Sequence, residues 1–108
     1  MRYQVRLTDD AAADLGDLYA YIARHDSPQN ADMVLDRIET VLESLARQPK
    51  RGVFPPELVE LGIREYREVF FKPYRIIYRI VGRTAYVFLI ADGRRDMQTL
   101  LKRRLLST

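Results

Sequence analysis

The spacing of apolar residues changes once along this 108-residue chain, and that change limits the folds open to it. Before residue 49 the apolar side chains recur every three or four positions, which is typical of amphipathic helices. After residue 63 they alternate or run together, which is typical of strands. A loop is predicted between these parts, because the residues there are rich in helix and strand breakers: Pro49, Gly52, Pro55, Pro56 and Gly62.

Two helices are predicted in the first part, after a short strand over residues 3–7. Thr8 is a good N-cap for a helix over residues 9–24, whose first turn holds two carboxylates. Ser27 and Pro28 indicate a second start, since Ser caps helices and Pro fits the first helical position. This second helix should end near Arg47, and the short connection predicts an antiparallel helical hairpin.

Three strands are predicted in the second part, over residues 64–72, 74–81 and 84–91. Turns at Pro73 and at Gly82-Arg83 separate them. The third strand is the most apolar and is therefore predicted to be central. Asp96 could cap a last helix that runs to about residue 106.

The resulting order, β-α-α-β-β-β-α, predicts an α+β fold in one domain spanning residues 1–108. We expect an antiparallel helical hairpin packed on a mostly antiparallel four-stranded sheet, followed by a short C-terminal helix. The other face of the sheet should then be partly open. No apolar run approaches the ~20 residues of a membrane span, and the N-terminus lacks a signal-peptide core. A cytoplasmic location and no membrane partner are expected.

Charge is distributed unevenly along the chain. Residues 1–48 hold five basic and nine acidic residues, whereas residues 49–108 hold thirteen basic and six acidic residues. The two parts therefore carry formal charges of −4 and +7, which add to the net charge of +3. A basic surface in the second half is the functional interpretation of this asymmetry.

Arginines of the second half should gather on one sheet surface. Alternation along residues 74–81 places Arg75 and Arg79 on the face away from Tyr78, which is the face expected to be open. Guanidinium groups bind phosphates and carboxylates in a bidentate manner, so converging arginines favour a phosphate or acidic-partner site. The candidates for target binding are Arg67, Arg75, Arg79, Arg94 and Arg95. As an alternative, about half of them form ion pairs with nearby carboxylates: Glu65, Glu68, Asp92 and Asp96.

The sequence gives little support for catalysis. The chain has no cysteine and one histidine, His25, at the end of the first predicted helix. Disulfides, a thiolate nucleophile and a Cys/His metal centre are therefore excluded, and no cofactor or metal is expected. RNA cleavage needs a general base and a general acid, and no such pair stands out beside the arginines. No catalytic residue is assigned, and a binding surface is favoured.

Four segments in order resemble the RelE/ParE toxins of type II toxin–antitoxin systems. Residues 3–8 with Asp14 and Leu15 are similar to the opening strand and helix of that superfamily, and residues 38–52 to its second helix and exit. Residues 74–78 (Tyr-Arg-Ile-Ile-Tyr) look like its most recognisable strand. Residues 91–96 (Ala-Asp-Gly-Arg-Arg-Asp) look like the ending of the ParE branch.

The resemblance implies two possible targets. In the RNA-cleaving RelE branch, basic residues at the places of Arg67, Arg75 and Arg95 hold the transcript. That branch also uses a basic residue where this chain has Val69, and a tyrosine or histidine where residues 97–101 have neither. These departures favour the ParE branch, whose members trap DNA gyrase, block replication and serve plasmid maintenance through growth arrest.

The resemblance also implies a cognate antitoxin, whose tail wraps the helical hairpin and sheet. Tyr19, Tyr21 and Met33 on the hairpin are candidates for contacting it. The implied partners are thus the antitoxin and DNA gyrase, in a homodimer or a toxin–antitoxin hetero-oligomer. The alternatives left open are a ribosome-dependent mRNA endoribonuclease of RelE type and a non-toxic antitoxin-binding module.

Overall fold

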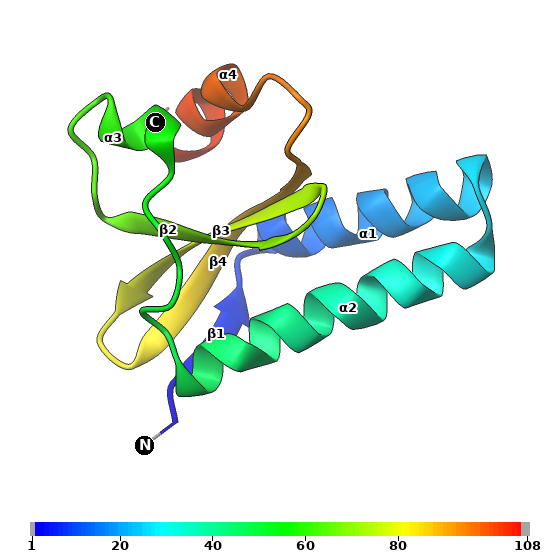
Figure 1. Ribbon diagram of the computed structural model, residues 1–108, viewed down its shortest axis with the longest axis horizontal. Coiled ribbons are helices and arrows are strands. Elements are labelled where there is room, and N and C mark those ends of the chain that lie inside the picture. Colours follow the sequence, from blue (N-terminus) through cyan, green and yellow to red (C-terminus); the bar gives the residue numbers. More distant parts are fainter. Residues whose placement is uncertain (1, 107–108) are drawn as a thin grey trace.

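A computed structural model describes residues 2–106 of the chain (Figure 1). The elements follow in the order β1 (Gln4–Leu7), α1 (Asp9–His25), α2 (Pro28–Arg47), α3 (Pro56–Val59), β2 (Tyr66–Phe71), β3 (Tyr74–Val81), β4 (Thr84–Asp92), α4 (Met97–Leu101) and η1 (Lys102–Leu106). The predicted α+β fold is confirmed, and the predicted elements occur in the predicted order, with one further short helix, α3, between α2 and β2. The helix starts match the prediction residue by residue, because the capping residues mark them.

The two long helices begin where their capping residues predict. The Thr8 hydroxyl accepts a hydrogen bond from the amide of Ala11 at 3.1 Å. The Ser27 hydroxyl accepts one from the amide of Asn30 at 3.0 Å, and Pro28 opens α2. Each cap satisfies an amide that the helix itself leaves unpaired, so it fixes the start of the helix.

The four strands form one sheet in the order β1-β4-β3-β2. Strand β4 lies in the interior, as predicted, and is antiparallel to β3 but parallel to β1. The register of β3 and β4 shifts at Phe88, because Ile77 pairs with Leu89 whereas Tyr78 pairs with Val87. This one-residue bulge in β4 alters which backbone groups of its second half point away from β3.

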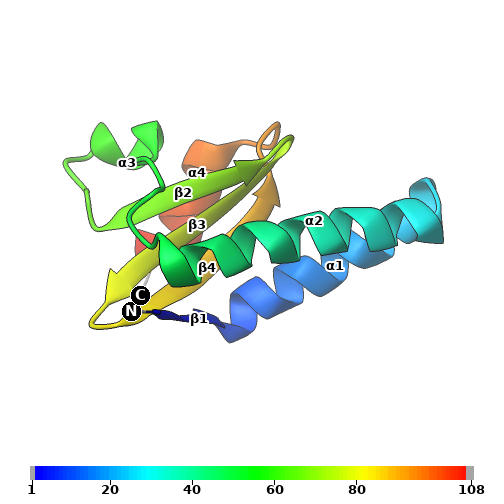
Figure 2. The same cartoon turned by 60° about the horizontal axis from the view of Figure 1, so that its bottom comes forward.

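One face of the sheet packs against the helical hairpin (Figure 2). Ile38 and Leu45 of α2 meet Ile76 and Tyr78 of β3 and Val87 of β4 in the first core, and all five are fully buried. The hairpin is longer than the sheet is wide, so its α1–α2 turn projects well past the strands (Figures 1 and 2). None of the helices among residues 2–106 is long and apolar enough to cross a membrane.

The opposite face of the sheet is largely covered, so the expectation of an open face is wrong for its centre. Leu58 of α3 and Leu100 and Leu101 of α4 pack over Ile77 and Leu89 in a second core. Short helix α3 lies in the segment predicted as loop and begins at the Pro55-Pro56 pair. Four residues are too few for a visible apolar period, which is why the sequence pattern did not reveal α3.

Candidate functional site

The structure divides the predicted arginines into groups with different partners. Arg94 and Arg95 follow β4 at one end of the sheet, beside Tyr74 at the start of β3. Arg67 and Arg79 lie at the other end, near the β3–β4 turn. Arg75 lies near Arg94 and Arg95, because it pairs with Ala91 and its side chain packs against Gly93. The five candidates therefore do not converge on one surface.

Arg75 is an internal anchor, and its predicted place on an open face is wrong. Its Nη atoms donate to both carboxylate oxygens of Glu57 in α3, each at 2.8 Å, and its Nε donates to Glu68 in β2 at 2.6 Å. The Arg75 side chain is 11% exposed and that of Glu68 only 2%. Because α3 brings Glu57 over the sheet, the guanidinium is enclosed and cannot meet a target directly.

The pKa values of this cluster follow from its geometry. The hydrogen bond from Arg75 lowers the pKa of Glu57 below its usual range. Burial raises the pKa of Glu68 by more than the hydrogen bond and charge of Arg75 lower it, so the net shift is upward. The pKa of Arg75 is raised, chiefly by its hydrogen bond to Glu57. The cluster thus stays charged at its centre while one of its carboxylates is poorly solvated.

A groove of about 490 Å³ lies between α1 and the end of β4. Its walls have opposite charge, with Asp14 and Asp17 on α1 and Arg94 and Arg95 on the segment after β4. Leu18, Tyr21 and Tyr74 are among its apolar and aromatic lining residues. A groove with apolar walls and charged rims suits a peptide segment from a partner protein.

Arg94 and Arg95 are both exposed at the rim of the groove. The Nη2 of Arg94 lies 2.6 Å from Asp92, which also accepts a hydrogen bond from the amide of Arg94 at 2.9 Å. These bonds hold the pKa of Asp92 below its usual range. Asp92 was among the predicted carboxylate partners. No ion pair within residues 2–106 joins Arg95 to a carboxylate, so its charge faces solvent.

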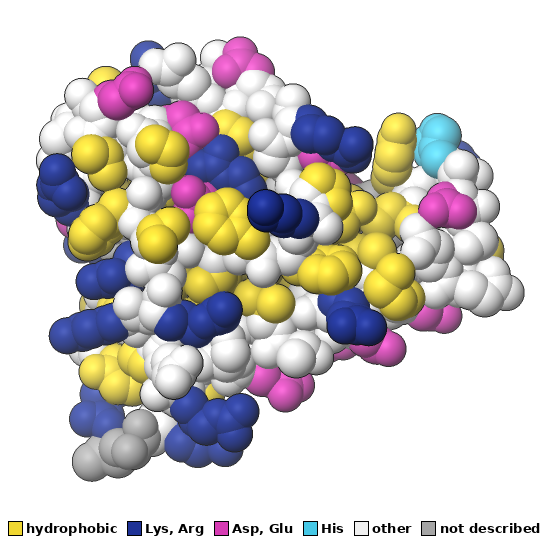
Figure 3. Space-filling view, in the orientation of Figure 1, with side chains coloured by type: hydrophobic (Ala, Val, Ile, Leu, Met, Phe, Trp, Pro, Cys, Tyr) yellow, Lys and Arg dark blue, Asp and Glu magenta, His cyan; other side chains and the backbone are white. Residues whose placement is uncertain are grey.

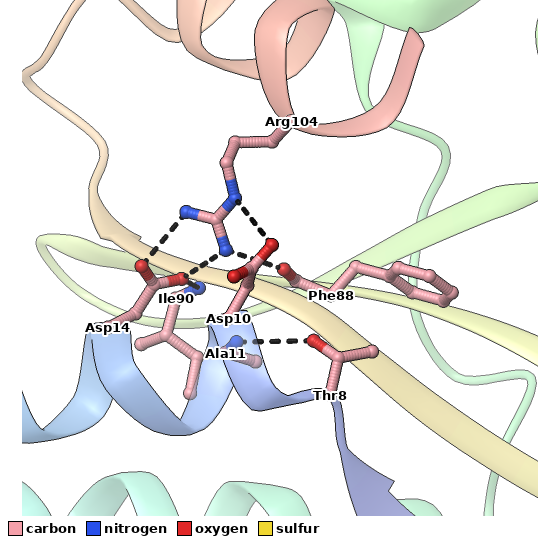
Figure 4. A network of polar contacts seen from close by, with 7 residues as sticks. All are labelled: Thr8, Asp10, Ala11, Asp14, Phe88, Ile90 and Arg104. Atoms are coloured by element: carbon pink, nitrogen blue, oxygen red, sulfur yellow. Dashed lines mark hydrogen bonds and ion pairs between the residues drawn. The ribbon is translucent and has the colours of Figure 1, made fainter. Parts of the chain in front are cut away.

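Beside this groove, side chains bond to the backbone groups of β4 that β1 does not reach (Figure 4). Strand β1 ends opposite Val87, but β4 continues to Asp92. The amide of Ile90 donates to Asp14 at 3.0 Å, and Arg104 of η1 donates to the carbonyl of Phe88 at 3.0 Å. Arg104 and Asp14 also form a bidentate ion pair at 2.9 and 3.0 Å. Together they satisfy the backbone groups that a longer β1 would have paired.

The sequence does not reveal this Asp14–Arg104 latch. Asp14 appears there only in the segment that resembles the opening helix of the RelE/ParE toxins, and nothing in the sequence marks Arg104 as its partner. The mismatch between a short first strand and a long last strand is the one signal that pointed to an unpaired edge. It cannot name the two side chains, because they are far apart in the sequence and meet only through the fold.

Arg67 and Arg79 stack on aromatic rings, whereas Arg75 and Arg94 form ion pairs with carboxylates. The Arg67 guanidinium lies 4.7 Å from the centre of the Phe54 ring, and Arg64 lies 5.8 Å from the same ring. Arg79 lies 5.9 Å from the ring centre of Tyr66. Arg67 pairs with Tyr78, on the face of the helical hairpin, whereas Arg79 pairs with Tyr66, on the opposite face. These arginines thus flank the end of the sheet from both sides.

Loop residues 49–54 are fixed in place by Tyr78 and Arg67. The Tyr78 hydroxyl accepts a hydrogen bond from the amide of Gly52 at 3.0 Å and donates one to the carbonyl of Pro49. Arg67 donates to the carbonyl of Gly52 at 2.9 Å. A Cβ atom at Gly52 would lie 2.6 Å from the Tyr78 hydroxyl, so only glycine allows this close approach. Phe54 is consequently held where two arginines can stack on it.

The candidate antitoxin contacts differ in their surroundings. Tyr19 is half-buried, and its hydroxyl donates to Asp32 of α2 at 2.6 Å. Tyr21 is 61% exposed, lines the groove and stacks on His25 at 4.1 Å. Met33 is exposed on α2. Of the three, only Tyr21 joins the groove, while His25 lies at the helix end as predicted.

Solved structures share this arrangement of a helical hairpin on a four-stranded sheet. The chromosomal ParDE toxin–antitoxin system of P. aeruginosa has a chain that is 19% identical, with a TM-score of 0.70, covering 84% of this chain and 96% of that one. The RelE toxin of E. coli in the free state is 12% identical, with a TM-score of 0.63, covering 97% and 100%. The RelBE2 toxin–antitoxin complex of Mycobacterium tuberculosis is 23% identical, with a TM-score of 0.56, covering 85% and 92%. The fold is therefore that of the RelE/ParE class.

Sequence comparison narrows the class to one branch. Residues 5–97 match the family described as the ParE toxin of the type II toxin-antitoxin system parDE. The curated toxin ParE3 of Caulobacter vibrioides is 26% identical over 97 residues, which cover 90% of this chain and 93% of that protein. This chain belongs to the ParE toxin family and is the toxin component of a type II toxin–antitoxin system. The resemblance to the ParE branch is confirmed.

Proposed function

We propose that this toxin arrests growth in the cytoplasm by binding DNA gyrase, and that it does so as a ligand of the enzyme and not as a ribonuclease. The observation that carries this proposal is that the two carboxylates beside Arg75, which could transfer protons, are both bonded to its guanidinium. Glu57 and Glu68 are both bonded to Arg75, and His25 is the last residue of α1, at the α1–α2 turn. A general base and acid need to reach the reacting atoms, and these groups are otherwise occupied.

Arg95 is the arginine we assign to the gyrase contact, with Arg94 beside it. Both lie exposed at the rim of the groove, and none of the ion pairs within residues 2–106 involves Arg95. A rim cation attracts an acidic partner surface and fixes its orientation. Arg75 contributes indirectly, because its side chain packs closely against Gly93 and so supports the backbone just before Arg94. A Cβ atom added at Gly93 would lie only 2.8 Å from the Cδ of Arg75.

The test is a supercoiling assay with purified gyrase and relaxed plasmid. The toxin should inhibit supercoiling and leave linear DNA after protein is removed. Arg95→Glu should weaken inhibition by about tenfold or more, equivalent to about 1.4 kcal/mol of binding. Arg24→Glu is the matched control, because Arg24 is also exposed but lies at the hairpin tip. Normal supercoiling with excess toxin, together with new transcript ends in translating extracts, would assign the RelE activity instead.

We further propose that a cognate antitoxin neutralises the toxin by filling the groove, so that it covers Arg94 and Arg95. Tyr21 is placed to contact it there, with Tyr19 and Met33 on the same helical hairpin as additional candidates. Tyr21→Glu should keep its toxicity but escape rescue by the co-expressed antitoxin. Ala13→Glu, also exposed on α1, is the control and should still be rescued. Light scattering of the complex would distinguish a homodimer from a toxin–antitoxin hetero-oligomer.

A further inference from the structure

The arginines of this protein sort by the chemistry of their partners. Arg75, Arg94 and Arg104 each bond to a carboxylate, and this offsets their charge. Arg64, Arg67 and Arg79, by contrast, stack on the rings of Phe54 and Tyr66. Among residues 2–106, none of these three lies within ion-pair distance of a carboxylate. We refer to Arg64, Arg67 and Arg79 as the ring-stacked arginines.

Stacking on a ring has a different consequence from pairing with a carboxylate. The ring holds the guanidinium by its flat face, so it fixes the position of the group without cancelling its charge. The N–H groups at the edge of the guanidinium stay suited to an oxyanion, and phosphate accepts such bonds in pairs. At Arg67 one Nη already donates to the carbonyls of Lys50 and Gly52, so only its other N–H groups can serve in this way. The rings are themselves fixed, because Tyr66 packs edge-on against Phe88 at 5.5 Å and Phe54 follows the loop that Tyr78 anchors.

Further basic residues surround the ring-stacked arginines. Arg47 ends α2, Lys50 and Arg51 lie in the loop that Tyr78 anchors, and Arg83 is in the β3–β4 turn, 5.2 Å from the ring centre of Tyr3. Figure 3 shows Lys and Arg side chains gathered on the side of the molecule where the β3–β4 turn lies, while acidic side chains follow the outer side of the helical hairpin. The field at this end of the sheet is therefore strongly positive.

We propose that the ring-stacked arginines bind the phosphate backbone of duplex DNA. Their rings are covered by guanidinium groups, so they do not offer the free stacking surface that unpaired bases need. Guanidinium groups on both faces of a sheet end suit phosphates spaced along a double helix. The choice of DNA over other polyanions rests on the proposed function, because duplex DNA is the substrate of gyrase. The toxin would then contact gyrase through Arg95 and the DNA through the opposite end of the sheet.

The test measures binding of the toxin alone to a labelled duplex of about 20 base pairs, by fluorescence anisotropy from about 50 to 200 mM salt. The double variant Arg64→Gln/Arg79→Gln is compared with Arg6→Gln/Arg24→Gln, which removes the same charge from exposed positions elsewhere. The first should reduce the slope of log affinity against log salt by about 1.8, since each phosphate contact contributes about 0.9. Arg67 is left intact because it also holds the loop.

Several results would overturn the proposal: equal slopes for the two double variants, absence of binding at the lowest salt, or tighter binding to a single strand or to an RNA duplex of the same sequence. Thermal melts of each variant show that it is folded before its slope is compared. Because gyrase is absent, this test is separate from that of the proposed function. Duplex binding without gyrase inhibition would contradict only the gyrase proposal, whereas inhibition without duplex binding would contradict only this one.

Discussion

At the scale of single residues, the most consequential side chain is Arg75. Its guanidinium is bonded to one carboxylate from α3 and one from β2, and it is nearly enclosed. A buried charge that loses its partner is costly, because water cannot replace the partner. Arg75 is therefore needed for folding before it can matter for any target.

Arg75→Ala should lower the free energy of unfolding by roughly 3–5 kcal/mol, since it leaves the buried Glu68 carboxylate unpaired. Arg24→Ala at an exposed site should change it by less than about 0.5 kcal/mol. Urea denaturation measures both values. Adding Glu68→Leu to Arg75→Met should recover most of the loss, because the buried charge is then removed too. A single variant as stable as the control would show that α3 does not enclose this cluster.

Glu68 and Glu57 should make the stability of the protein depend on pH in opposite directions. Its pKa in the folded state is raised, so the protonated form is favoured on folding, and stability is lost as pH rises through that raised pKa. The pKa of Glu57 is lowered, so the stability it contributes is present above its unfolded pKa and is lost as pH falls through its folded pKa. Stability should therefore decrease on both sides of a weakly acidic optimum.

Glu68→Gln separates these two effects. The variant should be more stable than the parent at about pH 7, because it removes the cost of the poorly solvated charge. It should also lose the decline in stability above the ordinary glutamate pKa, while keeping the decline at lower pH. Urea midpoints measured across the acid-to-neutral range test this expectation. A variant that is less stable at neutral pH would mean that the ion pair with Arg75 outweighs the burial of Glu68.

The sequence could predict part of the cluster around Arg75, but not that α3 covers it. Alternation along β3 correctly places Arg75 and Arg79 on the face away from Tyr78. Glu68 was considered as a partner because it lies on the neighbouring strand. Glu57 was not, because it belongs to a four-residue helix whose position over the sheet depends on tertiary packing alone. Which face of a strand is buried follows from local pattern, but what covers that face does not.

At the scale of elements, α1, β4 and η1 are joined by the Asp14–Arg104 latch. Asp14 accepts the amide of Ile90, and Arg104 donates to the carbonyl of Phe88 (Figure 4). An unpaired strand edge is a template for pairing with another chain, so the latch protects the molecule from such association. It also fixes the acidic wall of the groove.

Asp14→Ala should lower the free energy of unfolding by roughly 1–3 kcal/mol, because the amide of Ile90 and the charge of Arg104 lose their partner. It should also increase self-association through the edge of β4, visible by light scattering. Asp10→Ala is the control on the same helix, since Asp10 is 79% exposed and lies 3.9 Å from Arg104. Equal effects of the two substitutions would contradict the latch.

The elements themselves were largely predictable, for reasons visible in their end residues. Thr8, Ser27 and Asp96 each accept a backbone hydrogen bond at the start of a helix, as their positions in the sequence indicated. The bounds of β3 also matched, because Pro73 and Gly82 mark its ends. The latch and the groove were not predictable, because both are formed by side chains that are far apart in the sequence and meet only through the fold.

At the scale of the whole molecule, one sheet is shared by two cores. Ile76 and Tyr78 of β3 face the helical hairpin, while Ile77 faces α3 and α4. Neither core can be lost without exposing the strands on which the other is built. The protein is therefore expected to unfold in one cooperative step.

Truncation of a fully buried residue in either core tests this expectation. Ile38→Ala in the first core and Leu101→Ala in the second should each lower the free energy of unfolding by about 2–5 kcal/mol. Both should leave a single urea transition with the same slope as the parent protein. A separate early transition in Leu101→Ala, seen by fluorescence but not by circular dichroism, would show that α3 and α4 unfold independently.

The parallel pairing of β1 with β4 bears on how the toxin is made. Gln4 pairs with Thr84, so β1 has no partner strand until the much later strand β4 has been made. Until then only β2 and β3 are available to cover the apolar side of the helical hairpin. A nascent chain interrupted before β4 can form neither the central pair of strands nor the groove. The four-stranded sheet and the groove beside β4 therefore form only after residues 84–92 have been synthesised.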